Sequence, residues 1–147
     1  MGIRPQTPAI AADTIIELMD RPGRPIILIE RLNPPYGWAI PGGFVDLGET
    51  VEAAAVREAL EETRLEVTLQ ALLGCYSKPG RDPRGHTASM VYVAEARGEP
   101  IACDDARAVV ICDPGQVPQP LAFDHAEILK HYLAYREGGM PLPLNLG

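Results

Sequence analysis

Three glutamates that stand close together in the sequence, Glu58, Glu61 and Glu62, could bind a metal ion. The segment from Thr50 to Arg64 around them contains four alanines and neither glycine nor proline, which predicts a helix. Because successive residues of a helix are turned by about 100°, the three carboxylates fall within about 100° of one another. The apolar residues on the opposite face, which are expected to pack on a sheet, are Ala53, Val56 and Leu60.

Carboxylates this close repel one another, and each like-charged pair three or four residues apart costs a helix about 0.2 to 0.5 kcal/mol. A divalent cation such as Mg²⁺ or Mn²⁺ reverses that cost, since it prefers oxygen ligands and leaves positions open for water and phosphate oxygens. The alternative is that the glutamates simply solvate an exposed helix face, as most runs of charge do. The glutamates alone do not decide between the two.

The residues in front of this helix favour the metal site. The glutamates belong to a longer pattern, Gly43-x5-Glu49-x7-Arg57-Glu58-x2-Glu61-Glu62. This pattern resembles the Nudix box, the signature of the Nudix hydrolase family, at nearly every fixed position. It departs at Arg64, where the family has glycine. We expect Arg64 either to accept a left-handed conformation at some cost or to extend the helix slightly.

By this resemblance the chain folds as a single Nudix hydrolase domain over residues 1–147, with a loose tail from about 139 to 147. The implied fold is of the α/β class, an α/β/α sandwich with a mixed β-sheet. The implied reaction is hydrolysis of a nucleoside diphosphate linked to another group, with Mg²⁺ or Mn²⁺ as cofactor. The implied metal ligands are Glu58, Glu61, Glu62 and the carbonyl of Gly42. The implied catalytic residues are Glu58 and Glu61, as candidates for the general base, Arg57, which orients a carboxylate, and Glu49, which caps or supports the site.

Two segments outside the box, Arg31 to Asp46 and Tyr76 to His86, resemble the small ADP-ribose pyrophosphatases within this family. This resemblance implies that water attacks ADP-ribose to give AMP and ribose 5-phosphate, and that the chain forms a homodimer, as such enzymes often do. One alternative is a pyrophosphohydrolase for oxidised nucleotides of the 8-oxo-dGTP type or for dinucleoside polyphosphates. The other is a Nudix module that senses a nucleotide without hydrolysing it.

Arginines in these segments could bind the substrate, because their forked guanidinium groups donate to phosphate and ribose oxygens. The alternative is that they form surface ion pairs with acids such as Asp82 and Glu30. Trp38 and Tyr36 could stack on a base, although a lone tryptophan in a small domain is more often part of the core. The residues expected to bind substrate are Arg31, Trp38, Arg81, Asp82 and Arg84.

The three histidines are expected to have other functions. His86 lies in a polar loop that it can cap, and His125 and His131 belong to the last helix, where a structural or exposed position is expected. The start of that helix, from Phe123 to His125, could still border the pocket.

Alternating apolar runs separated by glycine and proline predict a mixed sheet packed by two helices. The segment Asp20 to Arg24 has the composition of a turn, so the strands on either side of it are expected to pair. The expected strands are Ala9 to Leu18, Pro25 to Leu32, Leu65 to Tyr76, Thr87 to Ala96 and Ala106 to Cys112. The expected helices are Thr50 to Arg64 and about Asp124 to Arg136.

Composition and charge exclude several classes of function. With 147 residues, 46% of them apolar and 22% charged, the chain fits one soluble domain, and no apolar run approaches the roughly 20 residues of a membrane helix. The formal net charge of −7 argues against a nucleic-acid binder. The N-terminus lacks the pattern of a secretory signal, so we expect a cytoplasmic protein whose partner is a small nucleotide. Without a CxxC pair, Cys75, Cys103 and Cys112 are expected to be buried free thiols.

Overall fold

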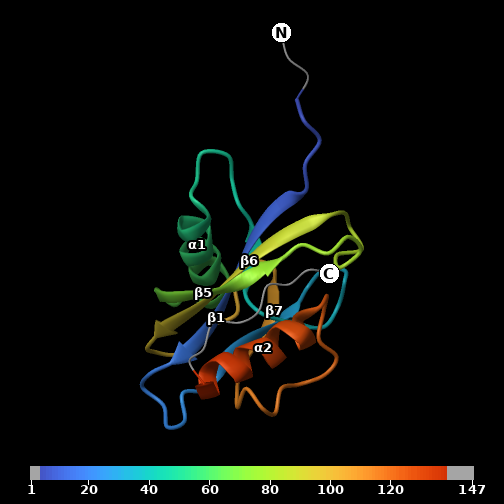
Figure 1. The fold of residues 1–147 in the computed structure, drawn as a ribbon. Coiled ribbons are helices and arrows are strands. Elements are labelled where there is room, and N and C mark those ends of the chain that lie inside the picture. Colours follow the sequence, from blue (N-terminus) through green and yellow to red (C-terminus); the bar gives the residue numbers. More distant parts are fainter. Residues whose placement is uncertain (1–3, 139–147) are drawn as a thin grey trace.

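The computed structural model describes residues 4–138, which form a seven-stranded sheet and two helices (Figure 1). The loose tail expected from about residue 139 lies outside the described residues. The strands are β1 (Ala9–Leu18), β2 (Ile26–Arg31), β3 (Trp38–Ala39), β4 (Gly42–Phe44), β5 (Thr68–Tyr76), β6 (Thr87–Ala96) and β7 (Ala106–Cys112). The helices are α1 (Val51–Thr63) and α2 (His125–Gly138). Every element expected from the sequence is present, although β5 begins at Thr68 rather than Leu65.

The sheet is mixed, as expected, and β1 lies in its interior. β1 pairs in parallel with β6 along all ten of its residues. Its other edge is divided between two antiparallel partners: β2 pairs with β1 only where Ile26 lies opposite Glu17, while β4 pairs with Ala11 to Asp13. The expected pairing of the first two strands is therefore confined to the end next to their turn, because β4 occupies the edge of β1 beyond it.

One helix covers each face of the sheet, which confirms the expected α/β/α sandwich (Figure 1). Neighbouring residues of a strand point to opposite faces. Ile15 of β1 accordingly packs in the core under α2, with Ile128 and Tyr132, whereas Ile16 packs in the core under α1, with Ala59. The two cores fix both helices against the same central strand, and so fix the side chains that the helices carry at the edge of the sheet.

α1 buries a different face from the one expected. Leu60 is 41% exposed and Ala53 is exposed, so the predicted apolar face was wrong except at Val56, which is partly buried. The helix packs instead through small side chains, which allow its backbone to approach β1, and the hydroxyl of Thr14 donates to the carbonyl of Ala55 at 3.5 Å. The buried residues of α1 are Ala54, Ala55, Ala59, Glu62 and Thr63. This close packing places Glu62 against the sheet.

Both ends of α1 are capped. At the N-terminus, the hydroxyl of Thr50 accepts the N–H of Ala53 at 3.0 Å. At the C-terminus, Arg64 has a φ of 68° and donates its N–H to the carbonyl of Leu60. Of the two alternatives, Arg64 therefore accepts the left-handed conformation, which a glycine would adopt more easily.

Arg64→Gly is expected to raise the free energy of unfolding by about 1 kcal/mol, because it removes the cost of a left-handed conformation at a residue with a Cβ. Arg64→Ala is the matched control: it also loses the arginine side chain but keeps the Cβ, so it should bring no such gain. Urea unfolding of the three proteins measures the difference. Equal stability of the glycine and alanine variants would contradict this explanation.

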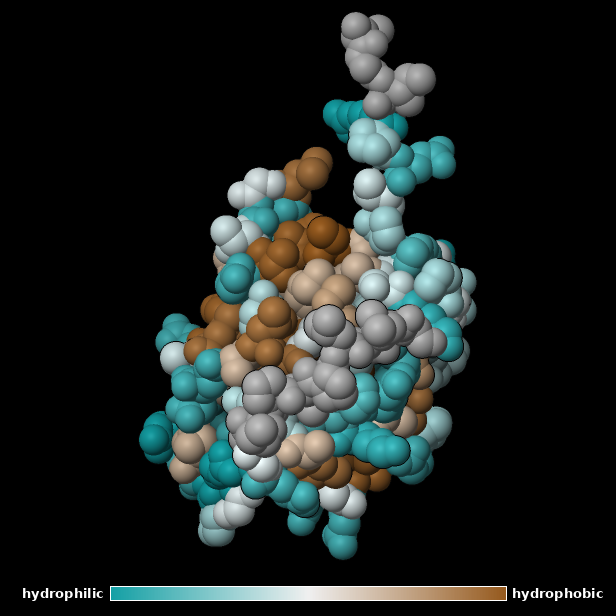
Figure 2. Space-filling view, in the orientation of Figure 1, coloured by the Kyte–Doolittle hydropathy of each residue, from teal (hydrophilic) through white to brown (hydrophobic). Residues whose placement is uncertain are grey.

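The face seen in Figure 2 mixes hydrophilic and hydrophobic side chains, and the hydrophobic ones gather around the loop that precedes α1. Phe44 and Leu47, at the start of and within that loop, are exposed, as is Ile10, whose carbonyl accepts the N–H of Val45. Neither helix in residues 4–138 is long and apolar enough to cross a membrane.

The three cysteines are free thiols, as expected, but the prediction that they are buried was wrong. Cys75 is exposed, and Cys103 and Cys112 are partly buried. Alternate residues of β5 point away from the core, and Cys75 is one of them.

Candidate active site

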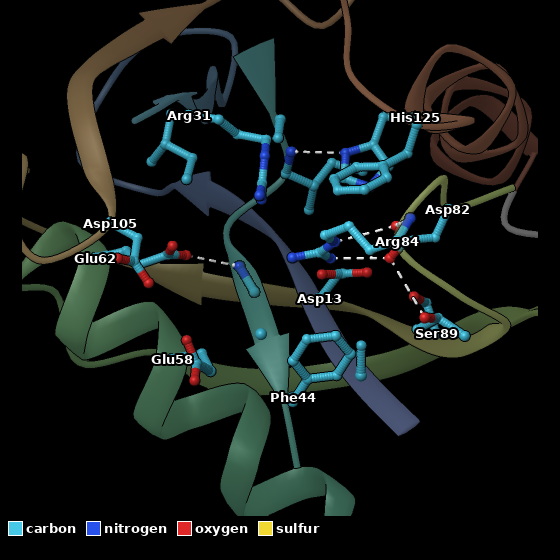
Figure 3. A pocket seen from close by; sticks show the side chains of 18 of the residues that line it. Asp13, Arg31, Phe44, Glu58, Glu62, Asp82, Arg84, Ser89, Asp105 and His125 are labelled. Carbon is cyan, nitrogen blue, oxygen red and sulfur yellow. Dashed lines mark hydrogen bonds and ion pairs between the residues drawn. The ribbon is translucent and has the colours of Figure 1, made fainter. Parts of the chain in front are cut away.

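A cavity of about 320 Å³ lies where α1, β4 and the start of α2 converge (Figure 3). Glu58 and Glu62 from α1, with Asp105 from the loop before β7, lie on one side of it. Asp82, Arg84 and His125 lie on the other side, and Asp13 of β1 stands between the two groups. A cavity with carboxylates on one wall and hydrogen-bond donors on the other can bind an anion together with a cation.

The Pro41-Gly42-Gly43 step brings the start of β4 against α1. The N–H of Gly42 donates to Oε1 of Glu62 at 2.8 Å. A Cβ on Gly43 would lie 2.5 Å from Cδ of Glu58, so only a glycine leaves room for that carboxylate. These contacts explain why the sequence departs from a regular pattern here, since the backbone of β4 must lie against two carboxylates of the helix.

Glu58 and Glu62 share surroundings that disfavour negative charge. Burial raises the pKa of Glu62 to about 8; the N–H of Gly42 opposes this shift, and the charges of nearby acids, Glu58 first among them, add to it. Burial also raises the pKa of Glu58, against the lowering effect of Arg57. A cation placed between such carboxylates would stabilise their charged forms.

Arg57 holds three carboxylates at the edge of this site. Its Nε and Nη2 donate to the two oxygens of Glu49 at 2.7 and 2.9 Å, and its Nη1 donates to Glu58 and Glu61, both at 2.8 Å. The hydrogen bonds from Arg57 lower the pKa of Glu49 to about 2, so that Glu49 stays charged. This geometry suits the functions expected of Arg57 and Glu49, which are to orient a carboxylate and to support the site.

The carboxylate oxygens of Glu58 and Glu62, at this end of the cavity, are the kind of metal ligand that Mg²⁺ prefers. Glu58 and Glu62 line the cavity, whereas Glu61 does not. Arg57 binds both Glu58 and Glu61. Within residues 4–138, no three His, Cys, Asp or Glu side chains are close enough together to enclose an ion. Of the three helix glutamates, Glu58 and Glu62 are therefore placed for a cation, and the side chain of Glu61 would have to turn toward the cavity to join them.

The four polar residues expected to bind substrate all line the cavity: Arg31, Arg81, Asp82 and Arg84. Two of the arginines are also in ion pairs, but only the pair of Arg84 with Asp82 matches the alternative of a surface ion pair. Nε and Nη2 of Arg81 bind both oxygens of Asp124, and those of Arg84 bind both oxygens of Asp82. The side chain of Arg81 is 4% exposed and that of Arg84 is 43% exposed. Arg84 can therefore still contact a ligand, whereas Arg81 mainly holds its loop to the start of α2.

Trp38 lies outside the cavity. It is partly buried and packs against the core under α2, so the structure does not support a stacking function for it. Tyr36 is 68% exposed. His86 donates to the carbonyl of Ser77 at 2.8 Å, which is the capping function expected of it.

Several residues that line the cavity were not assigned to it from the sequence, among them Asp13, Phe44 and Asp105. Asp13 is an acid within the apolar strand β1, and this contrast was the one signal that could have indicated it. Burial raises its pKa to about 7, against the lowering effects of Arg81 and Ser89. Asp105 lies in an irregular loop, where no pattern of residues marks it.

His125 is buried and lines the cavity, so the start of the last helix does border the pocket. Its Nδ1 accepts the N–H of Ile40 at 3.0 Å. Burial lowers its pKa to about 4; the charge of Asp124 opposes this shift, and the charges of Arg81 and Arg31 add to it. The ring is therefore neutral at pH 7.

The protein is expected to lose stability through His125 as the pH falls from about 6.5 to about 4. The unfolded chain binds a proton at the ordinary pKa of 6.5 and the folded protein binds it only near 4, so protonation favours unfolding in this window. At pH 5 this costs about 2 kcal/mol relative to pH 7. Urea unfolding at both pH values should show a smaller difference for His125→Asn than for the wild type. An equal pH dependence of the two proteins would contradict this expectation.

Comparisons with known proteins agree with the fold and with the pattern around α1. The NUDIX domain model matches residues 8–132. The chain is 47% identical over 134 residues to the ADP-ribose pyrophosphatase of Methanocaldococcus jannaschii, which covers 89% of this chain and 76% of the relative. It is 31% identical over 136 residues to the ADPR responsive transcriptional repressor NtrR of Acinetobacter baylyi, which covers 87% of this chain and 54% of the repressor.

A solved structure shares the fold. The MutT/nudix family protein from Enterococcus faecalis has a TM-score of 0.80 and 26% identity, over 93% of this chain and 65% of that chain. The family match includes β1, the glycine step and all of α1 with its glutamates. Since the match extends over most of the chain, this protein belongs to the NUDIX domain family.

Proposed function

We propose that this chain hydrolyses the diphosphate linkage of ADP-ribose, releasing AMP and ribose 5-phosphate, with Mg²⁺ or Mn²⁺ as cofactor. The observation that carries the proposal is the cavity in which Glu58 and Glu62 lie across from Arg84 (Figure 3). Nudix hydrolases in general depend on a divalent metal, which suits the acidic wall. The name and the 47% identity of the relative from M. jannaschii support ADP-ribose as the substrate.

When bound at the acidic wall, a divalent cation would supply positive charge that offsets the charge of the phosphate oxygens and favours deprotonation of an attacking water. Glu58 and Glu62 would hold the cation, with the carbonyl of Gly42 and, once turned toward the cavity, the carboxylate of Glu61. Arg57 keeps Glu58 in position through its hydrogen bond at 2.8 Å. Gly43 leaves the space in which the carboxylate of Glu58 lies.

The attacking water must lose a proton to a carboxylate. Glu58 and Asp105 both line the cavity, whereas Glu61, the other candidate from the sequence, does not. We therefore keep Glu58 as a candidate for the base and put Asp105 in the place of Glu61. Elsewhere in the cavity lining, the guanidinium groups of Arg31 and Arg84 would bind phosphate oxygens and balance the charge of the leaving phosphate.

A substrate panel tests the proposal. The purified protein is given ADP-ribose, 8-oxo-dGTP and a diadenosine polyphosphate in parallel with Mg²⁺, and the released products are measured. ADP-ribose is expected to have the highest kcat/KM, and the proposal falls if it is among the poorest substrates. Binding of ADP-ribose without hydrolysis would instead identify a nucleotide-sensing module, which is the alternative that the name of the A. baylyi repressor suggests.

A further inference from the structure

His125 presents one hydrogen-bond donor to the cavity. Its side chain is 3% exposed, and its Nδ1 accepts the backbone N–H of Ile40 at 3.0 Å. A backbone N–H can only donate, so Nδ1 must be the unprotonated nitrogen of the ring. The hydrogen of the neutral ring is then on Nε2.

The Nε2–H has no hydrogen-bond partner among residues 4–138. In the same residues, no side-chain nitrogen or oxygen that is sealed from solvent lacks a partner. Because His125 lines the cavity and its Nε2 is therefore not sealed from solvent, the Nε2–H is left to face that open space. Burial lowers the pKa of His125 to about 4, so the ring stays neutral and keeps this single donor across the physiological range.

The side chains around His125 indicate which kind of ligand group would bind beside it. The ring of Phe123 lies 5.2 Å from the imidazole, and Ile29, Ala39 and Ile40 add an apolar wall. Both oxygens of the nearby carboxylates of Asp124 and Asp82 already accept hydrogen bonds from arginines. This end of the cavity therefore offers donors beside apolar surface.

The donors here differ in charge. Arg31 lies over the ring of Phe123 with its guanidinium 4.9 Å from the ring centre, and Arg84 lies over the same ring at 5.3 Å. The guanidinium groups are available to balance the charge of the phosphates, whereas a neutral N–H can pair with an uncharged acceptor without burying an unbalanced charge. A nucleotide carries such acceptors only outside its phosphates, as the oxygens of the sugar and the ring nitrogens of the base.

We propose that His125 is a substrate-binding residue whose Nε2–H donates to an uncharged acceptor atom of the nucleotide, in the part of the substrate that lies beyond the diphosphate. This inference rests on the proposed function for the identity of the ligand. It assigns to His125 the recognition of a sugar oxygen or a ring nitrogen, and leaves the phosphates to the arginines and the cation.

Two substitutions separate the two nitrogens of the ring. His125→Asn places an oxygen close to where Nδ1 stands, so it can still accept the N–H of Ile40, but it has no atom at the position of Nε2. His125→Gln reaches the position of Nε2 with an amide donor and loses the acceptor for Ile40. His131→Asn is the control on the same helix, because the Nδ1 of His131 is paired with the hydroxyl of Tyr76.

The affinities of AMP and of ribose 5-phosphate are measured by calorimetry in the presence of Mg²⁺. Neither compound contains a diphosphate linkage, so neither is hydrolysed during the measurement. His125→Asn is expected to weaken one of the two by about 3- to 10-fold, the loss of one neutral hydrogen bond. A loss confined to AMP places the acceptor in the nucleoside, and a loss confined to ribose 5-phosphate places it in the other sugar. His125→Gln should keep more of the affinity than His125→Asn, although it is less stable, and His131→Asn should bind both as the wild type does.

Nitrogen NMR of the wild-type protein provides a readout that does not depend on any variant folding. A neutral ring protonated at Nε2 is expected from pH 6 to 8, with a shift of the Nε2 signal when AMP or ribose 5-phosphate is added. A ring protonated at Nδ1 would overturn the proposal. In a protein that hydrolyses ADP-ribose, the proposal would also be overturned if His125→Asn bound AMP and ribose 5-phosphate as the wild type does and the Nε2 signal did not move when they were added. Failure to hydrolyse ADP-ribose while the Nε2 signal still shifts would overturn the proposed function alone.

Discussion

Substitution of Glu62 by glutamine is expected to lower kcat/KM for ADP-ribose by at least about 100-fold, because a neutral amide is a poor ligand for a divalent cation whose charge stabilises the transition state. The amide has nearly the same size and keeps an oxygen that can accept the N–H of Gly42, so the fold should survive. It also replaces a carboxyl whose charged form is disfavoured by burial with a group that carries no charge. The free energy of unfolding without metal should therefore be unchanged or higher.

Three measurements on the Glu62→Gln variant separate a metal ligand from a structural residue: kcat/KM with Mg²⁺, the affinity for Mn²⁺ by electron paramagnetic resonance, and urea unfolding. Glu52→Gln is the control, since it removes an exposed acid from the first turn of the same helix and should leave all three values near those of the wild type. Near-normal turnover of Glu62→Gln would remove Glu62 from the set of metal ligands. Loss of turnover together with a large loss of stability would point to a structural function instead.

Gly43→Ala is expected to reduce kcat/KM by about 100-fold while the protein stays folded, as a displacement of about 1 Å at a reacting centre can do. The added Cβ would lie 2.5 Å from Cδ of Glu58, at the far end of a flexible side chain. The carboxylate of Glu58 can move away, so the cost falls on the site rather than on the fold. Steady-state kinetics and urea unfolding of the same sample measure the two effects.

The neighbouring glycine provides the contrast. In Gly42→Ala the added Cβ would lie 2.5 Å from the backbone oxygen of Ala12 and 2.8 Å from Cα of Asp13, which cannot move away without shifting β1. This variant is expected to lose about 3 kcal/mol of stability or more. In Gly115→Ala the nearest atom would be an oxygen of Asp113 at 3.4 Å, so activity and stability should both be kept. If Gly43→Ala lost stability as Gly42→Ala does and kept its kcat/KM, the assigned space for Glu58 would be wrong.

Features encoded by a few neighbouring residues were predictable from the sequence. The cap at Thr50, the extent of α1 and the irregular end at Arg64 depend on local chemistry, and the structure shows each of them. The boundaries of the longer strands follow closely from apolar runs interrupted by glycine and proline, whereas the short strands β3 and β4 were not predicted. The pattern from Gly43 to Glu62 indicated the family, but it did not predict the strand β4 or its contact with α1.

Features that depend on tertiary packing were not predictable in the same way. The buried face of α1 follows from how closely alanines let the helix approach β1, which the period of apolar residues does not reveal. β2 and β4 both pair with the same edge of β1. The turn that begins at Asp20 therefore predicted the pairing of β1 with β2 at only one residue pair. His125 and Asp105 are distant in sequence from Glu58, and only the folded chain places all three in the lining of one cavity.

The central claim is that the acidic wall holds a divalent cation for the hydrolysis of a diphosphate. The most direct test is the rate of AMP release from ADP-ribose by the wild-type protein with Mg²⁺, after EDTA, and after an excess of Mg²⁺ is restored. We expect release of AMP and ribose 5-phosphate with Mg²⁺, its loss in EDTA and its return with Mg²⁺. Unchanged release in EDTA, or no release with either Mg²⁺ or Mn²⁺, would contradict the claim.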